Sequence, residues 1–222
     1  MARIRHIAMR SDRQEDVAAF YRDTFGLTEV FRHISATNGR LAIYLTDGEI
    51  NLAVIPGAGR ATGIDHFGFQ VDDVEATSAA ALAAGAMQGA TRVPQDGRQN
   101  EAFIKDPVGQ RVDLSSAGWH HGGEGAARIR HVAFLTDDPS QLAAFYTRVF
   151  GLNEVARNGA GVSLSDGHVN LELLPKATAE TPDARPGITS LGFHVDGERF
   201  SAPFVLDPQG QRVDLSVAGW SL

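Results

Sequence analysis

The chain repeats itself, and this internal duplication constrains its fold more than any other feature of the sequence. Residues 3–30 align without gaps to residues 128–155, with 15 identities in 28 positions. Residues 106–119 align in the same way to residues 207–220, with 12 identities in 14 positions. Because a repeated sequence folds into a repeated structural unit, the pattern predicts two related domains in tandem.

The two copies also place the predicted domain boundaries. We expect one domain over residues 1–119 and a second over residues 128–222. The sequence HHGGEGAA of residues 120–127 lies between them, and its glycines are costly to order, so we expect a flexible linker. His120 and His121 in this linker are of a metal-ligand type, but a solvated linker is the favoured interpretation.

Each domain is expected to consist of two βαβββ units, which makes the chain an α+β protein. Apolar residues spaced two apart predict strands, and apolar residues at helical spacing predict a helix after the first strand of a unit. Gly26 is expected to end the first helix, and Asp47-Gly48 to form a hairpin turn. The elements expected in the first domain are strands at 4–9, 28–33, 40–47, 50–56 and 64–71, helices at 12–26 and 74–84, and three further strands, the last two joined by a turn at 106–109.

Composition excludes several classes of function. The formal net charge is −7 and no Lys/Arg cluster occurs, which argues against a nucleic-acid partner. The chain has no cysteine, so disulfides, thiolate metal sites and cysteine nucleophiles are excluded. No apolar run reaches the length of a membrane span, and the N-terminal residues lack the apolar centre of a signal peptide. We therefore expect a cytoplasmic protein without a membrane partner.

Strand alternation selects three residues of the first domain as candidate metal ligands. Successive side chains of a strand point to opposite faces. In the strands around residues 4–9, 64–71 and 110–116, apolar side chains occupy one face, and the opposite face carries His6, His66 and Asp113, respectively. Gly68 shares that face, and glycines there are expected to leave room for a ligand inside a curved sheet.

Two histidines and one carboxylate form a facial set of ligands. Such a set binds Fe(II), and it also suits Zn, Mn, Co or Ni. Three protein ligands leave coordination positions open, so that oxygens of a substrate can bind the metal directly. A packed or hydrogen-bonded histidine is the ordinary alternative for either ring alone, but three ligand types on matching faces of three strands favour a metal site.

The motifs FYxxxFGL, DHFGFQVDD and DPxGxRVDL, together with the paired βαβββ units, resemble the vicinal oxygen chelate superfamily. This superfamily includes glyoxalase I, bleomycin-resistance proteins, methylmalonyl-CoA epimerase, fosfomycin-resistance enzymes and extradiol dioxygenases. The resemblance implies a cup around a divalent metal, with ligands from the first and last strands of each unit. The matching positions are His6, Asn51, His66 and Asp113.

Two of these positions depart from the pattern of the superfamily. Asn51 stands where glyoxalase I has a glutamate that binds metal and serves as a base, and an asparagine cannot take a proton. Asp113 stands where most members have the longer glutamate, so the metal is expected closer to that strand or bound through water. A three-ligand site of this kind resembles extradiol dioxygenases and some fosfomycin-resistance enzymes.

The second copy is expected to be degenerate. Its four matching positions are His131, Asn170, Ser190 and Asp214, so one ligand is missing. From Ser190 to Asp214 the chain runs 24 positions, against 47 from His66 to Asp113, so the last unit is truncated. We expect this domain to support the first one structurally. Two questions stay open: whether Asp214 rather than Asp113 completes the first site, and whether Glu172 and His194 form a displaced site, for which a surface histidine is the favoured alternative.

Three functions are compatible with these residues. The sequence favours a metal-dependent enzyme whose small-molecule substrate presents vicinal oxygens to the metal, specifically an Fe(II) extradiol-type ring-cleavage dioxygenase. A glyoxalase-like lyase, isomerase or epimerase and a metal-free binding protein of the bleomycin-resistance type are the alternatives. Tyr44 is the candidate catalytic residue, as a hydrogen-bond donor or acid, with packing as its alternative role. A homodimer is also compatible with the sequence.

Overall fold

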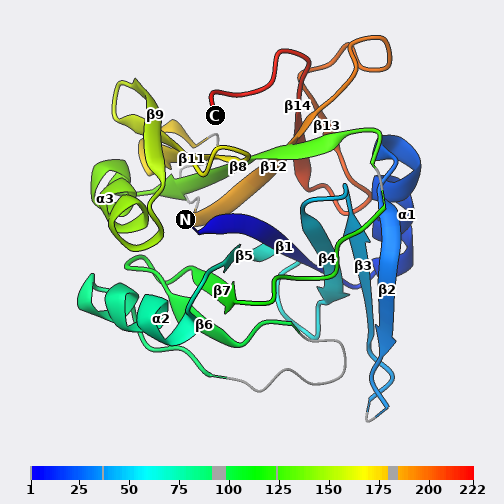
Figure 1. The fold of residues 1–222 in the computed structure, drawn as a ribbon. Helices are drawn as coiled ribbons and strands as arrows, with labels where there is room; N and C mark the ends of the chain where they lie inside the picture. The colour runs from blue at the N-terminus through cyan, green and yellow to red at the C-terminus, as the bar shows by residue number, and fades with distance from the viewer. Residues whose placement is uncertain (1, 37, 92–98, 124, 180–184) are drawn as a thin grey trace.

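The computed structural model describes residues 2–36, 38–91, 99–123, 125–179 and 185–222, and it contains two seven-stranded sheets (Figure 1). The first sheet has the order β2-β3-β4-β1-β5-β7-β6. Its strands are β1 (Arg3–Ser11), β2 (Thr28–Ile34), β3 (Leu41–Thr46), β4 (Asn51–Pro56), β5 (Gly63–Gln70), β6 (Ala102–Lys105) and β7 (Arg111–Ser115). All of them come from the first copy of the repeat.

The second sheet repeats this arrangement with strands of the second copy, in the order β13-β14-β12-β8-β11-β10-β9. Its strands are β8 (Arg128–Thr136), β9 (Asn153–Asn158), β10 (Gly161–Ser165), β11 (Asn170–Pro175), β12 (Gly187–His194), β13 (Phe204–Leu206) and β14 (Arg212–Ser216). The helices are α1 (Gln14–Phe25), α2 (Val74–Ala83), α3 (Pro139–Phe150) and the short 3₁₀ helix η1 (Lys176–Thr178). The expected α+β fold of tandem βαβββ units with a truncated last unit is confirmed.

The helices begin and end where their sequence signals lie. Gly26 and Gly151 adopt left-handed backbone conformations, with φ of 69° and 72°, directly after α1 and α3. Asp138 caps the first turn of α3, because its side chain accepts a hydrogen bond from the backbone N–H of Gln141. The two helices therefore end alike, but they begin differently, because Arg13 at the start of α1 makes no side-chain cap.

Two expectations about the first domain were wrong. In place of a third strand after α2, the described residues form only isolated bridges, at Met87 and Thr91. The linker is not wholly solvated, since the ring of His120 stacks on Phe31 at a centroid distance of 4.6 Å and its carbonyl oxygen accepts a hydrogen bond from Asn51. Apolar and polar partners on the first domain thus hold this end of the linker.

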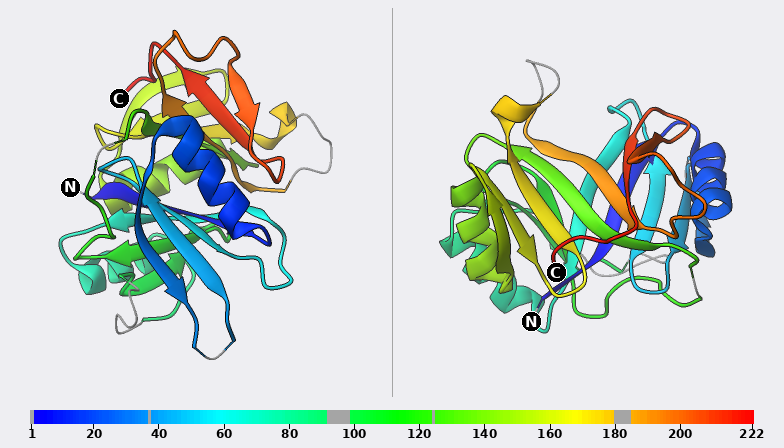
Figure 2. Two further views of the ribbon diagram at one scale, coloured as in Figure 1. Left: turned by 90° about the vertical axis from the view of Figure 1, so that its right-hand side faces the viewer. Right: turned by 90° about the horizontal axis from the view of Figure 1, so that it is seen from above.

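One hydrophobic core runs through both domains, because the first helix of each copy contacts the last unit of the other (Figure 2). Phe25 at the end of α1 stacks on Phe193 of β12 at 4.0 Å, and Phe150 of α3 stacks on Phe69 of β5 at the same distance. The truncated unit has no helix of its own in its described residues, and Phe200 lies 5.7 Å from Phe25 on the same side.

Buried polar contacts between the copies follow the same approximate two-fold pattern. The Tyr146 hydroxyl donates to Asp106 at 2.8 Å, and the Tyr21 hydroxyl donates to Asp207 at 3.4 Å. Burial raises the pKa of Asp106 to about 6, even though the Tyr146 hydroxyl and backbone N–H groups stabilise its charged form. The two domains are therefore joined by apolar stacking and by buried hydrogen bonds.

Candidate metal centre

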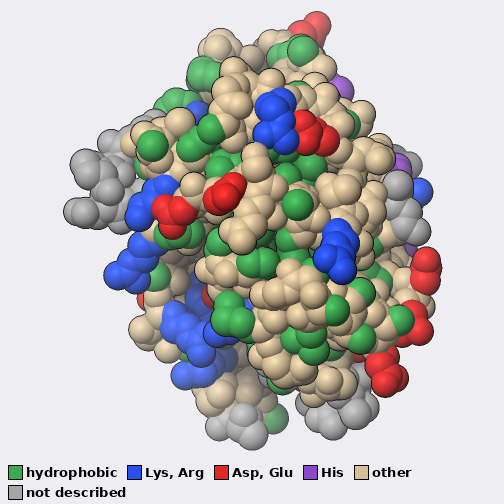
Figure 3. All heavy atoms as spheres, turned by 90° about the vertical axis from the view of Figure 1, so that its left-hand side faces the viewer, with side chains coloured by type: hydrophobic (Ala, Val, Ile, Leu, Met, Phe, Trp, Pro, Cys, Tyr) green, Lys and Arg blue, Asp and Glu red, His purple; other side chains and the backbone are tan. Residues whose placement is uncertain are grey.

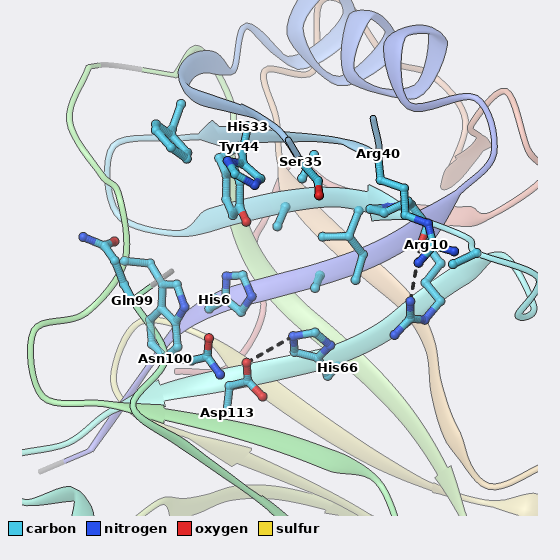
Figure 4. Close-up of a pocket in the computed structure, with 18 of the residues that line it drawn as sticks. His6, Arg10, His33, Ser35, Arg40, Tyr44, His66, Gln99, Asn100 and Asp113 are labelled. Atoms are coloured by element: carbon cyan, nitrogen blue, oxygen red, sulfur yellow. Dashed lines mark hydrogen bonds and ion pairs between the residues drawn. The ribbon is translucent and has the colours of Figure 1, made fainter. Parts of the chain in front are cut away.

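A cavity of about 920 Å³ opens on the concave face of the first sheet (Figure 4). The central strands β1, β5 and β7 form its floor, and their register brings the predicted ligands together. His6 of β1 lies opposite Gly68 of β5, which in turn lies opposite Asp113 of β7, while Ala8 lies opposite His66. Three neighbouring strands therefore each direct one candidate ligand into one cup.

His6, His66 and Asp113 converge in this cavity. Their potential ligand atoms all lie within 4.8 Å of one another, and all three residues are buried. The His66 Nε2 atom lies 3.4 Å from Asp113 Oδ2, and the two imidazole rings are 5.4 Å apart. In the part of the chain that the structure describes, this is the one group of three such residues with ligand spacing.

Asn51 fixes the imidazole of His6. The Asn51 Nδ2 atom donates a 2.8 Å hydrogen bond to the His120 carbonyl, which can only accept, so Asn51 Oδ1 faces His6. Nδ1 of His6, 2.9 Å from that oxygen, is therefore the protonated nitrogen, and the lone pair on Nε2 is available to a metal. Asn51 acts on His6 and is not placed as a fourth ligand by these contacts.

His66 is oriented in a similar way by a carboxylate. Asp65 Oδ2 lies 2.6 Å from His66 Nδ1, and Arg10 holds Asp65 with hydrogen bonds of 2.5 and 3.1 Å. A carboxylate that accepts the second N–H of a histidine fixes the ring and raises its basicity as a ligand. Both histidines thus present Nε2 to the cup.

Asp113 completes the group from β7. Arg111 donates to both of its oxygens, at 2.5 and 2.9 Å, and the guanidinium lies over the ring of Phe103 at 4.6 Å. A carboxylate has about four lone-pair directions, so these bonds leave room for a metal or for His66. Burial alone would raise the pKa of Asp113, but His66 and Arg111 outweigh it and lower that pKa below its ordinary range.

The surroundings shift the pKa values of the two histidines in opposite directions. Burial, followed by the nearby charge of His66, lowers the pKa of His6 to about 3, so His6 is neutral at pH 7. Burial also acts to lower the pKa of His66, but the Asp113 carboxylate outweighs it and raises that pKa above its usual value. The Asp113 carboxylate therefore favours the protonated form of His66, and a bound cation would compete with that proton.

Tyr44 lines the same cavity from β3, opposite Ala53 of β4. Its ring lies 5.5 Å from Phe31 and 6.1 Å from His120, and Figure 4 shows its hydroxyl directed into the cup. The structure thus brings Tyr44 into the cavity of the three candidate ligands, at a place where it can contact a bound molecule.

Trp119 is the residue that the sequence reasoning missed. Its indole stacks on His6 at 4.8 Å with an interplanar angle of 7°, and a Cβ at Gly68 would lie 2.7 Å from that indole. The expectation that Gly68 leaves room for a ligand was therefore wrong, because Trp119 fills the space. A signal existed: the two tryptophans of the chain, Trp119 and Trp220, lie at matching positions of the copies.

The second cup keeps this framework without the second histidine. His131 stacks on Trp220 at 4.8 Å and lies 3.0 Å from Asn170, as His6 does with its own partners. Ser190 donates to Asp214, which pairs with Arg212 in the same sheet. Asp214 belongs to the second cup, so Asp113 is the aspartate beside His6.

The displaced site suggested by His194 is not formed. His194 is exposed at the end of β12, and its Nε2 atom lies 3.0 Å from the Val217 carbonyl oxygen. Glu172, by contrast, lines the second cavity close to His131. The two residues therefore do not share one metal position.

On the face drawn in Figure 3, basic side chains gather at the lower left and acidic side chains lie along the right edge. None of the described helices is both long and apolar enough to cross a membrane.

Solved structures of two dioxygenases and a glyoxalase share this fold. The 2,3-dioxygenase LapB from Pseudomonas sp. KL28 superposes with a TM-score of 0.73 at 17% identity, covering 99% of this chain and 93% of that one. The Mn(II)-bound glyoxalase from Novosphingobium aromaticivorans gives 0.73 at 17% identity, covering 97% and 82%. Homoprotocatechuate 2,3-dioxygenase from Arthrobacter globiformis gives 0.71 at 14% identity, covering 96% and 78%.

Sequence comparison assigns the family. No curated protein matches the chain significantly. The sequence model described as the Glyoxalase/Bleomycin resistance protein/Dioxygenase superfamily matches residues 3–114 and 128–199, once in each copy. The match covers most of the chain and both of its domains. This chain therefore belongs to the Glyoxalase/Bleomycin resistance protein/Dioxygenase superfamily.

Proposed function

We propose that the protein is a divalent-metal-dependent enzyme that acts on a small substrate chelating the metal through adjacent oxygens. His6, His66 and Asp113 hold the ion. The observation that carries this proposal is the convergence of their ligand atoms within 4.8 Å, with Nδ1 of each histidine already hydrogen-bonded to Asn51 or Asp65. Both rings are thereby arranged to coordinate through Nε2.

The donor set fits a first-row divalent ion. Two neutral imidazoles and a carboxylate suit Fe(II), Mn, Zn, Ni or Co. An ion held there would supply a Lewis acid for the two substrate oxygens, and iron would add the redox chemistry that ring cleavage by dioxygen requires. The three ligands come from the floor of the cup, so the open coordination positions of the ion would face the cavity.

Extradiol-type ring cleavage by an Fe(II) dioxygenase is the favoured reaction. Asn51 is engaged with His6 and His120, which leaves three protein ligands and no carboxylate base at that position. The dioxygenase LapB has the same fold, and this likeness of fold alone supports the choice. The fold shared with a Mn(II)-bound glyoxalase favours the alternative, a lyase, isomerase or epimerase.

The remaining lining residues favour an anionic substrate. Among the described residues that line the cavity, Arg10 is paired with Asp65 and Arg111 with Asp113, which leaves the Arg40 guanidinium to contact an anionic group. A deprotonated diol or an enediolate suits this field. Tyr44 would donate a hydrogen bond or a proton to the bound substrate. The homodimer stays a prediction.

Metal content is the measurement that tests the proposal. The native protein, His66→Ala and the matched variant Ser190→Ala would be purified without chelator and analysed for metals. We expect about one ion per chain in the native protein and in Ser190→Ala, and none in His66→Ala. No metal in any of the three, even after incubation with divalent ions, would leave a metal-free binding protein.

The identity of the ion then separates the reactions. Iron together with oxygen uptake on a panel of catechols supports the dioxygenase. Nickel, zinc, cobalt or manganese without oxygen uptake supports the lyase or isomerase.

A further inference from the structure

The second cup contains two hydrogen-bond acceptors that face each other. His131 is 3% exposed, and its Nδ1 donates to Asn170 Oδ1 at 3.0 Å, because Asn170 Nδ2 is committed to the Ser221 carbonyl. Nε2 of His131 therefore carries a lone pair. It lies 3.5 Å from Oε2 of Glu172, a carboxylate. The Glu172 side chain is 38% exposed while His131 is buried, and a donor placed between the two acceptors would satisfy both.

No cationic side chain among the described residues of this cup pairs with Glu172. Within the described part of the chain, Glu172 lies at ion-pair distance from His131 alone. Arg212, the cation of this cup, donates to Asp214 at 2.7 Å, and Ser190 donates to the other oxygen of Asp214. Burial and the charge of Asp214 raise the pKa of Glu172, which agrees with a carboxylate that lacks a cationic partner.

The charge of this cup is opposite to that of the first. In the sheet, Glu172 lies opposite Ser163 and Ala133. The equivalent residue of the first copy is Ala53. Leu135 of β8 takes the place of Arg10. Compared with the first copy, the second therefore has one carboxylate more and one arginine fewer in the wall of its cavity. This change of charge differs from a simple loss of function.

The cavity itself is large enough for a small molecule. It measures about 700 Å³, within the range of ligand pockets. Apolar side chains form much of its wall, and they are Ala133, Leu135, Leu174, Pro203, Leu215 and Trp220. An apolar body would lie against these residues while a polar end reaches Glu172.

We infer that the second cup is a metal-free binding site for a small organic cation that carries an apolar group. The ammonium or guanidinium group of the ligand would donate hydrogen bonds to both Glu172 Oε2 and His131 Nε2. It would thereby satisfy the two acceptors and neutralise the carboxylate, since a charge-assisted hydrogen bond is stronger than a neutral one. The inference is independent of the metal centre in the first domain.

Benzylamine is the probe that tests this site, in the full chain. Binding would be followed by NMR through the indole N–H resonances of Trp119 and Trp220, because each tryptophan lies in one cup. We expect benzylamine to shift the Trp220 resonance, with Glu172→Gln weakening binding at least tenfold. Glu154→Gln, a change at an exposed glutamate paired with Arg157, is the control and should leave binding unchanged.

Charge selectivity and metal competition complete the experiment. Benzyl alcohol and benzoate have the same ring, and we expect both to bind at least tenfold more weakly than benzylamine. Equal binding of benzylamine and benzyl alcohol, binding unchanged in Glu172→Gln, or no response of Trp220 would overturn the inference. So would zinc binding by His66→Ala that Glu172→Gln abolishes, because the second cup would then be a metal site.

Discussion

Nδ1 of His6 lies 2.9 Å from Oδ1 of Asn51, and the same pair recurs in the second copy as His131 and Asn170 at 3.0 Å. In both copies the asparagine amide is held by a backbone carbonyl further along the chain. The asparagine therefore selects the tautomer of each histidine, whether or not a second histidine is present. The asparagine is part of the framework of both copies, and in the first copy alone it orients a candidate metal ligand.

Replacement of Asn51 should weaken metal binding. In Asn51→Ala the His6 ring loses the acceptor that fixes its tautomer, and loss of such a partner typically costs 10–100-fold in metal affinity. Competition with a chelator of known affinity measures the change. Asn170→Ala is the matched control and should keep the native metal affinity. Equal losses in both variants would indicate a general effect on folding instead.

Ser190→His should create a second metal site. Ser190 contacts Asp214 at the position from which His66 contacts Asp113, and His131 already presents Nε2 to the second cup. The metal content should therefore rise from about one to about two ions per chain, with Ser190→Asn unchanged. A content that stays at one ion would mean that the truncated unit holds Asp214 at an unsuitable distance.

Asp106→Asn should remove a pH-dependent term from the stability. The pKa of Asp106 is raised to about 6 in the folded protein from an ordinary value of 3.8, so between these values the folded state binds a proton that the unfolded state has lost. Its stabilising contribution is complete below about pH 4 and is lost as the pH rises through about 6, about 3 kcal/mol in total.

Urea unfolding of both proteins from pH 4 to pH 7 measures this effect. The Asp106→Asn variant should gain stability relative to the native protein as the pH rises, since an amide can still accept from the backbone and donate to Tyr146. The exposed Asp23→Asn is the control and should show no such trend. A constant difference between the native protein and Asp106→Asn would contradict the prediction.

Phe193→Ala should destabilise both domains together. Phe193 is fully buried and stacks on Phe25 of the other copy at 4.0 Å, and removal of a buried phenylalanine costs about 3–5 kcal/mol. Because the core is continuous, circular dichroism and metal release should report one unfolding transition at a lower urea concentration. Phe69→Ala, in the equivalent stack with Phe150, should behave alike. Two separate transitions would show that the domains unfold independently.

Much of the fold and of the candidate site follows from local sequence patterns. Identity between the copies gives the tandem repeat, and strand alternation places His6, His66 and Asp113 on one face, because the side-chain period of two is a property of the backbone. Sheet register then decides that Asp113, and not Asp214, lies beside His6. Register depends on contacts between distant segments, so the two identical flanking sequences cannot distinguish these residues.

Contacts between side chains far apart in the sequence could not be predicted. The helical spacing of Phe25 indicates that it is buried, but it does not identify Phe193 as its partner. Gly68 looked like space for a ligand, whereas Trp119, 51 residues later, fills that space. His120 looked solvated because glycines follow it, yet Phe31 and Asn51 hold it. In each case packing between distant segments determines the contact partner, which local sequence propensity does not specify.

The helix of each copy packs against the sheet of the other copy, and this has a consequence for how such a duplicated gene can change. Mutations that erase chemistry in the second half, such as a serine at position 190, leave the core intact and are tolerated. Mutations that remove Phe150 or Phe193 would destabilise the half that holds the candidate metal ligands, so selection on that half would also preserve the other one. A second copy tied in this way is free to acquire a new ligand, but a deletion cannot remove it.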